Sequence, residues 1–339
     1  MGRRRPADLS PVSTGHLPPP DRVGALVDSA HALFKVNAEG VNASHYPALA
    51  AVPRDLFGIC VATVDGRLHV AGDADHPFTI MSVAKPFVFA LVCQALGADA
   101  ARAHLGVNST GLPFDSLAAI ELRSDRMTNP MVNAGALATT SLVPGATGEE
   151  KWQRISEGLS RFAGRRLNVD AEVLASAAAT NHANRRLARE LERWGRLYFD
   201  TAATIDLYTR QSCLSVTARD LAAMSATLAN GGVNPLTLEQ VIAPGTCQPV
   251  LAVMATAGLY ETSGDWLYSI GLPGKSGVGG GVITVAPGKG GMGTFAPPLD
   301  AAGNSVKGVL AARFLSDHLG LSLFASQPAV AQAAQSAEP

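Results

Sequence analysis

The spacing of hydrophobic positions changes along the chain and predicts a helix followed by a β-hairpin at its start. Over residues 21–36, apolar side chains recur at helical spacing, so one face of this helix is expected to pack on the rest of the protein. Residues 57–64 are almost continuously apolar, as in a buried strand. The turn signal Asp65-Gly66 then leads to a returning strand over 67–72.

The middle of the chain, residues 98–265, has the spacing of helices. Two segments, 149–163 and 184–198, carry arginine and glutamate on the face away from their apolar stripe. The sequence Thr-Ala-Arg-Asp at 217–220 predicts a capped helix start, and a further helix is expected over 247–260.

Strand-like spacing returns towards the C-terminus. Residues 281–285 and 291–295 are predicted to be two strands joined by turn residues, and a last amphipathic helix is expected over 304–319. Two groups of strands separated by helices predict an α+β fold with one antiparallel sheet, completed from both ends of the chain.

This order predicts two structural parts and two tails. Residues 23–97 and 266–324 would form an α/β part with the sheet and the nucleophile helix, and residues 98–265 a mostly helical subdomain. Residues 1–22 and 325–339 would be flexible tails. The first tail lacks the apolar stretch of a secretory signal.

Composition and charge exclude several classes of protein. With 47% hydrophobic and 16% charged residues, the chain can bury a large core and is not expected to be disordered. A net charge of −1 gives no indication of nucleic acid as a partner, and no apolar run reaches the ~18 residues of a membrane span.

The histidines lack metal-ligand spacing. The four cysteines form no C-x-x-C pair and are expected to be buried free thiols, which suits the cytoplasm.

The candidate chemistry begins at Ser82-x-x-Lys85. Residues three apart share a helix face, so the serine hydroxyl can meet the lysine amine, and a lysine kept neutral by burial can activate a serine nucleophile. Because Pro86 is tolerated only near a helix start, the helix is expected to begin at about Ser82. This short pattern also arises by chance. It gains weight from Lys-Ser-Gly at 275–277 before a late strand, since the pair is the arrangement of serine β-lactamases and penicillin-binding proteins.

Further motifs in matching order make the chain resemble the bacterial-type and mitochondrial glutaminases over about residues 24–320. The motifs are Thr-Val-Asp-Gly at 63–66, Ser82-x-x-Lys85, Asn-Pro-Met-Val-Asn-Ala-Gly-Ala at 129–136, and the stretches 226–232, 254–260 and 271–281. The resemblance implies a β-lactamase-like fold, with an antiparallel sheet flanked by helices and a helical subdomain. It also implies a cofactor-free amidohydrolase that acts on L-glutamine, and a homodimer or homotetramer.

The resemblance implies catalytic roles for four residues. Ser82 would attack the side-chain amide of glutamine, and Lys85 and Tyr260 would transfer protons. The backbone N–H groups of Ser82 and Val278 would form the oxyanion hole that acyl transfer requires.

Three other residues would bind the substrate's α-amino and α-carboxylate end: Asn133, Asn184 and Tyr208. Each also has a purely structural interpretation. Asn133 and Asn184 could cap helices, and Tyr208 could be a core aromatic residue with a hydrogen-bonded hydroxyl.

Three positions depart from the family pattern. The glutamate that binds the substrate's ammonium is replaced by Ala177, and the glutamine usual before the nucleophile is Met81. A tyrosine that precedes the first strand is His45 or, displaced by one position, Tyr46. Two functions are therefore considered. One is a glutaminase with a Ser82 acyl-enzyme, and the other is a serine hydrolase of the same fold acting on another amide, lactam or ester. A non-enzymatic binding role is disfavoured because the catalytic residues are kept.

Overall fold

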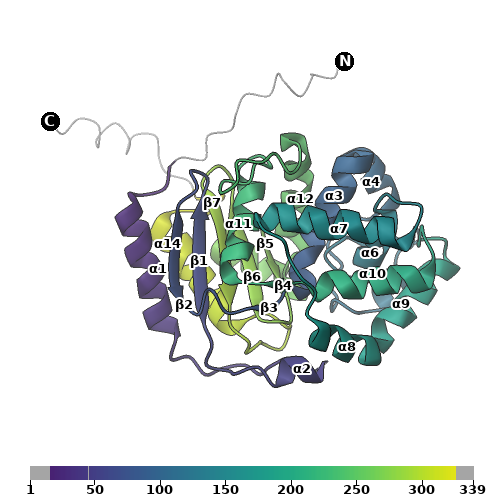
Figure 1. Ribbon diagram of the computed structural model, residues 1–339, viewed down its shortest axis with the longest axis horizontal. Helices are drawn as coiled ribbons and strands as arrows, with labels where there is room; N and C mark the ends of the chain where they lie inside the picture. Colours follow the sequence, from purple (N-terminus) through teal and green to yellow (C-terminus); the bar gives the residue numbers. More distant parts are fainter. Residues whose placement is uncertain (1–15, 45, 326–339) are drawn as a thin grey trace, which may run out of the picture.

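One antiparallel sheet of five strands, in the order β2-β1-β7-β6-β5, lies at the centre of the computed structural model, which describes residues 16–44 and 46–325 (Figure 1). The strands are β1 (Gly58–Thr63), β2 (Leu68–Gly72), β5 (Gly274–Ser276), β6 (Gly281–Ala286) and β7 (Gly290–Phe295). β1 pairs with β7 along its whole length, so strands from the two ends of the chain meet at the middle of the sheet. The expected antiparallel sheet, completed from both ends, is confirmed.

The edge of the sheet differs from the prediction at one strand. The Lys-Ser-Gly sequence precedes the strand β6, as expected, and in addition Gly274–Ser276 is itself a short edge strand that pairs with β6. Lys275 is therefore held by the ladder and lies opposite Ile283.

Helices cover both faces of the sheet. On one face, α1 (Pro20–Phe34), α13 (Ser263–Ile270) and α14 (Val306–Leu319) share a buried apolar cluster with the strands. On the other face, α11 (Ala218–Ala229) packs across β7 and β1. The approach is close because β7 is rich in glycine: a Cβ atom on Gly291 would lie 2.3 Å from the backbone nitrogen of Ala226.

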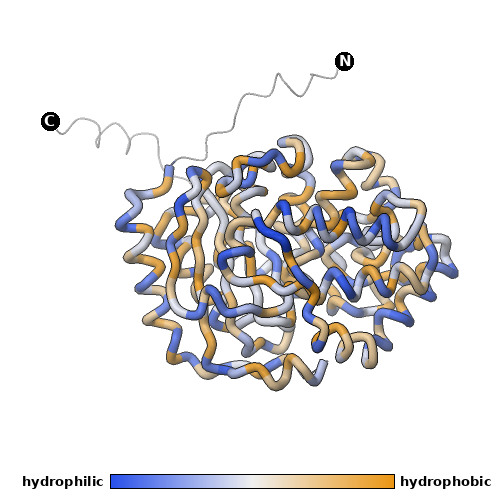
Figure 2. The backbone as a smooth tube through the Cα atoms, in the orientation of Figure 1, coloured by the Kyte–Doolittle hydropathy of each residue, from blue (hydrophilic) through white to orange (hydrophobic). Residues whose placement is uncertain are grey.

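A group of helices forms the other half of the molecule. They are α4 (Ala98–His104), α5 (Ala118–Glu121), α6 (Asn133–Leu142), α7 (Gly148–Ala163), α8 (Ala171–Thr180), α9 (His182–Arg193), α10 (Thr201–Ser212) and α12 (Pro244–Ala257). The two predicted amphipathic helices correspond to α7 and α9, although α9 ends earlier than expected. Along α1 and α7, hydrophilic and hydrophobic positions alternate, as expected for helices with one face in water (Figure 2).

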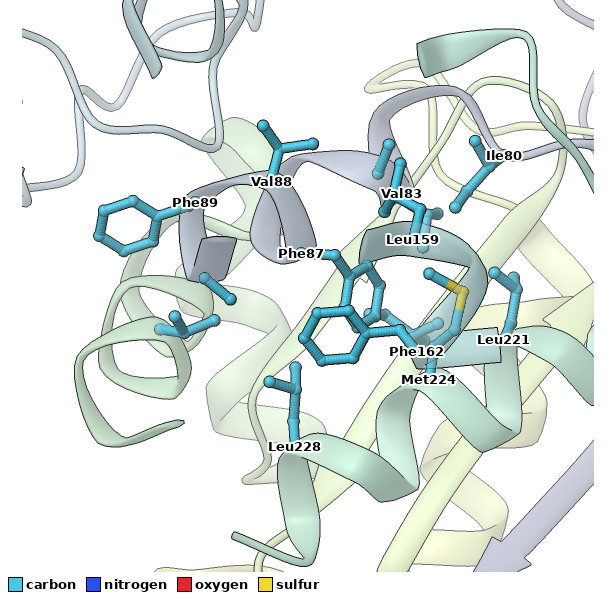
Figure 3. Close-up of a cluster of buried hydrophobic side chains, with 14 of the residues drawn as sticks. Ile80, Val83, Phe87, Val88, Phe89, Leu159, Phe162, Leu221, Met224 and Leu228 are labelled. Atoms are coloured by element: carbon cyan, nitrogen blue, oxygen red, sulfur yellow. The ribbon is translucent and has the colours of Figure 1, made fainter. Parts of the chain in front are cut away.

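The helix α3 (Ala84–Leu96), which follows the 3₁₀ turn η2 (Met81–Val83), lies in the principal core. Phe87 on α3 packs on Phe162 of α7, with ring centroids 5.0 Å apart, beside Met224 of α11 (Figure 3). The core thus joins the nucleophile helix to the helical half and to the helix that covers the sheet.

The two predicted parts are more closely connected than the sequence pattern indicated. α11 lies within the range 98–265 expected for the helical subdomain, yet it packs on the sheet. A second, two-stranded sheet pairs β3 (Phe78–Thr79) with β4 (Ser215–Val216), and β4 was not expected within the helical range. The boundaries of the two parts remain a prediction.

The ends of the chain were predicted to be tails. Residues 1–15 and 326–339 lie outside the described residues, and Pro20 to Arg22 already belong to α1. The remaining short elements are α2 (Pro47–Ala50) and the 3₁₀ turn η3 (Tyr260–Thr262). Within the described ranges, no single helix is long and apolar enough to cross a membrane; Met81–Leu96 and Ala98–His104 meet that criterion only together, as a pair bent by 115°.

Candidate active site

Ser82 lies in a sharp backbone turn and faces a cavity of about 130 Å³. Met81, the residue before it, has a left-handed backbone with φ 47°, which is uncommon for a residue with a side chain. The turn ends β3 and starts the η2–α3 helical segment, so the expected helix start near Ser82 is confirmed. The cavity is lined by Tyr46, Met81, Ser82, Phe114, Asp115, Asn133, Thr180, Asn181, Ala183, Asn184, Tyr208, Ser212 and Val278.

Lys85 is buried one turn further along the same segment. Its amine donates to Oδ1 of Asn133 at 2.6 Å and to the carbonyl of Met131 at 3.3 Å. Burial lowers the pKa of Lys85 to about 7, against a smaller opposing effect of the Asp115 carboxylate. A large share of the amine is therefore neutral near pH 7 and able to accept a proton.

Ser82 and Lys85, which the sequence places on one helix face, form no direct hydrogen bond within the described structure. The Ser82 side chain lies close enough to the Tyr260 hydroxyl to influence its pKa, and that hydroxyl donates to the carbonyl of Ser276 at 3.0 Å. Burial raises the pKa of Tyr260 to about 12, so the phenol stays protonated. Tyr260 also has a left-handed backbone, with φ 58°, in the η3 turn rather than at the end of the preceding helix as expected.

Lys275 places a second buried amine beside this tyrosine. Its amine lies 4.1 Å from the centre of the Tyr260 ring and donates to the Ser276 carbonyl at 2.6 Å. Burial, together with the nearby Lys85, holds the pKa of Lys275 well below its usual range. Lys275 therefore favours the neutral form more than an exposed lysine does. It packs on the Tyr260 ring, and the two side chains donate to the same carbonyl.

A chain of side-chain amides joins Lys85 to the far wall of the cavity. Asn133 donates to Asn184 at 2.9 Å, and Asn184 donates to Asn181 at 2.6 Å. Neither Asn133 nor Asn184 caps a helix: both are inside helices, and neither α6 nor α9 has a side-chain cap. The capping interpretation is therefore wrong, because these amides bond to one another across the site.

Tyr208 completes this network from α10. It is a buried aromatic residue, and its hydroxyl donates to Oδ1 of Asn133 at 3.1 Å. Burial raises its pKa well above the usual value, so the hydroxyl remains a donor. The interpretation as a core aromatic with a bonded hydroxyl describes Tyr208 correctly, but the bond is to a residue of the cavity wall.

Val278 lies in the tight turn that follows β5. The turn is closed by the N–H of Gly280 donating to the carbonyl of Gly277 at 3.0 Å. In the described part of the chain the N–H of Val278 donates to no protein group. A Cβ on Gly277 would lie 3.3 Å from the nitrogen of Ser82, so this turn passes directly beside the Ser82 backbone.

Two of the positions that depart from the family pattern belong to an apolar cluster beside the cavity. Ala177 and Met81 are both buried, and they share a hydrophobic cluster with Val173 and Cys213. Tyr46 packs against this cluster and lines the cavity. His45 lies outside the described residues.

Six residues that line the cavity were not found from the sequence: Phe114, Asp115, Thr180, Asn181, Ala183 and Ser212. Phe114 and Asp115 precede α5 and carry no motif, yet both line the cavity. The carbonyl of Phe114 accepts from the N–H of Asn133 at 2.8 Å, and its ring lies 5.0 Å from that of Tyr260. Only the folded chain brings this loop to the site.

The described residues contain no group of three or more His, Cys, Asp or Glu side chains that could hold a metal ion. The four cysteines are free and buried, as expected. Burial is the main cause that raises the pKa of each thiol to about 12, which keeps these thiols protonated. The groups that meet at the cavity are a serine hydroxyl, a lysine with a pKa of about 7 and a protonated tyrosine.

The antiparallel sheet with helices on both faces, and a cavity between it and a helical half, define a protein of the β-lactamase-like fold. A model of the family described as "Glutaminase" matches residues 40–324. "Glutaminase 2" of Yersinia pestis is 63% identical over 317 residues, which cover 94% of this chain and 93% of that protein. The chain belongs to the glutaminase family.

Two solved structures agree with this assignment. "Probable glutaminase ybaS" is 41% identical, with a TM-score of 0.90 over 91% of this chain and 100% of that chain. The "Probable glutaminase from Bacillus subtilis complexed with 6-diazo-5-oxo-L-norleucine" is 30% identical, with a TM-score of 0.79 over 89% of this chain and 96% of that chain.

Proposed function

We propose that this protein is a glutaminase that hydrolyses the side-chain amide of L-glutamine to L-glutamate and ammonia through an acyl-enzyme on Ser82. The observation that carries the proposal is the cavity in which a Ser82 hydroxyl, a buried Lys85 with a pKa of about 7 and a protonated Tyr260 come together. Family membership supports glutamine as the substrate.

In the first half of the reaction, the Ser82 hydroxyl attacks the amide carbon and a C–O bond forms. Its proton passes to the neutral Lys85 amine, assisted by the Tyr260 hydroxyl that lies near Ser82. The oxyanion that develops is stabilised by the N–H groups of Val278 and Ser82. The C–N bond then breaks, and the leaving nitrogen takes up the proton and departs as ammonia.

In the second half, water replaces ammonia. A water molecule attacks the ester carbon and gives a proton to the same lysine–tyrosine pair. The bond from the carbon to Ser82 breaks, and the serine oxygen recovers its proton as glutamate is released. No step requires a metal or another cofactor.

The test is ammonia release from millimolar L-glutamine by the purified protein. Ser82→Ala should abolish turnover, and rapid quenching of the wild-type reaction should reveal a glutamyl adduct on the peptide that contains Ser82. Ser212→Ala is a matched control, since it removes a hydroxyl from the wall of the same cavity. It should retain turnover. Ammonia release by Ser82→Ala at the wild-type rate would refute the acyl-enzyme.

The apolar cluster beside the cavity motivates the second candidate, a serine hydrolase of this fold that acts on another amide, lactam or ester. Ala177 and Met81 bring no charge to this cluster that could attract an ammonium. An acylating probe that labels Ser82 in a protein that does not turn over glutamine would favour this candidate. Full protection of Ser82 by low concentrations of glutamine would exclude it.

A cytoplasmic location is part of the proposal and is supported by the four buried, unpaired cysteines. A homodimer or homotetramer is proposed from the family resemblance. Size-exclusion chromatography with light scattering tests this point.

A further inference from the structure

Among the described residues that line the cavity, Asp115 is the only one with a charged side chain, and the others are apolar, amide, hydroxyl or phenol groups. Ala177 lies in an apolar cluster beside the cavity. A carboxylate is therefore present in the site, but it comes from a loop more than 60 positions earlier in the chain than Ala177.

The carboxylate of Asp115 has no protein partner within the described structure: no hydrogen bond and no ion pair is made to it. Other partly buried carboxylates of this protein are paired. Asp220, for example, accepts from Arg165 at 2.7 Å. A half-buried carboxylate without a cation is costly, because part of its hydration is lost and not replaced. Such a group in a cavity wall is available to a cationic ligand.

The loop that carries Asp115 is held against Asn133 and Tyr260. Its neighbour Phe114 accepts a backbone hydrogen bond from Asn133 at 2.8 Å and packs on the Tyr260 ring. Asp115 is also close enough to Lys85 to raise the pKa of that amine. The Asp115 carboxylate therefore lies near the Asn133 amide and near the Lys85 amine.

The nearby amines compensate this carboxylate only in part. Burial lowers the pKa of Lys275 well below its usual value and that of Lys85 to about 7, so both amines favour the neutral form more than exposed lysines do. A ligand that brings its own positive charge is therefore favoured beside Asp115.

We propose that the Asp115 carboxylate binds the α-ammonium group of the substrate, in place of the glutamate that is missing at position 177. Asp115 then makes the site selective for amides with a free amino group over N-blocked amides. This inference rests on the proposed glutaminase function.

The test compares L-glutamine with N-acetyl-L-glutamine in wild type and in Asp115→Asn, which keeps the shape of the side chain and removes its charge. Rates are measured well above the acid limb of the pH profile, where Lys85 is neutral in both proteins. For glutamine, kcat/KM should fall about ten- to a hundred-fold, mainly through KM, because a charge-assisted hydrogen bond is lost. For N-acetylglutamine it should change little. Asp265→Asn removes the same charge from an exposed helix position and should leave both substrates unaffected.

The outcomes separate the inference from the function. Equal losses for both substrates would overturn the inference, since they would mean that Asp115 shapes the site or tunes Lys85. An unchanged glutamine KM would overturn it too. A wild-type protein that releases no ammonia from glutamine would instead overturn the proposed function, and the inference with it.

Inhibition of the wild-type protein gives a second test, which does not depend on the folding of a variant. The inhibition constant of L-glutamate should be at least about ten-fold lower than that of glutarate, which has the same two carboxylates and no ammonium. In Asp115→Asn the two inhibition constants should become similar. Equal inhibition of the wild type by both compounds would refute the ammonium site.

Discussion

Asn133→Asp offers a sharp test of Lys85 as the base. The substitution replaces an amide oxygen by a carboxylate oxygen of the same geometry, 2.6 Å from the Lys85 amine. The surroundings of Lys85, mainly through burial, cost its charged form about 5 kcal/mol net, the free energy that corresponds to lowering its pKa from 10.5 to about 7. A carboxylate in this contact stabilises the charged form and offsets that cost.

The expected size of the effect follows from the neutral fraction of Lys85. In the wild type, about 90% of the amine is neutral at pH 8, and the acid limb of the rate lies near pH 7 because protonated Lys85 cannot accept the Ser82 proton. If the pKa returns to its ordinary value of 10.5, only about 0.3% is neutral at pH 8. The rate at saturating glutamine should then fall about 300-fold at pH 8 and recover about ten-fold for each pH unit above it.

The assay is kcat for ammonia release between pH 6 and pH 10, with circular dichroism to confirm that each variant is folded. The other ionisable groups around Lys85 are Lys275, Tyr260 and Asp115, and only a change at Lys85 should move the acid limb upwards. Asn184→Asp is the matched control. It adds the same charge to the same network without contacting Lys85, so its acid limb should move much less. An acid limb that stays near pH 7 in Asn133→Asp would refute Lys85 as the base.

Two further predictions concern packing and the ammonium site. Gly291→Ala should destabilise the fold by about 1–3 kcal/mol in urea unfolding, because its Cβ would lie 2.3 Å from both Ala226 N and Ser225 Cβ. Gly245→Ala, whose Cβ would meet nothing within 4 Å, should be neutral or stabilising, and equal effects would contradict the packing argument. Ala177→Glu in the Asp115→Asn background should lower the KM for glutamine, since position 177 shares a helix face with the cavity residues Thr180 and Asn181. It should also lower the melting temperature, because the new carboxylate enters an apolar cluster. An unchanged KM would mean that the ammonium site cannot be rebuilt there.

Local patterns were sufficient for most elements of the fold. The β1–β2 hairpin follows from an apolar run and an Asp-Gly turn, and the capped start of α11 from Thr217 and Asp220, which form the expected capping box. These features depend on residues a few positions apart, whose backbone preferences act regardless of the rest of the chain. The short strands β4 and β5 were missed because two or three residues carry no periodicity.

Resemblance supplied the site residues, but it did not determine how they interact. The sequence indicated that the Ser82 hydroxyl and the Lys85 amine can meet, whereas the structure bonds Lys85 to Asn133 and places Ser82 near the Tyr260 hydroxyl. The helical spacing of Ser82 and Lys85 places them on one side of a helix. It does not specify which partner from another element is nearer.

By itself, the sequence determined the order of helices and strands, the α+β class and the family, because these are encoded in local spacing and in motifs of adjacent residues. The tertiary structure decided which groups meet in the cavity. Lys85 and Asn133 are 48 positions apart, and Asp115 belongs to a loop without a motif. Contacts of this kind depend on how separate elements pack, and the depressed pKa of Lys85 exists only because packing removes its amine from water.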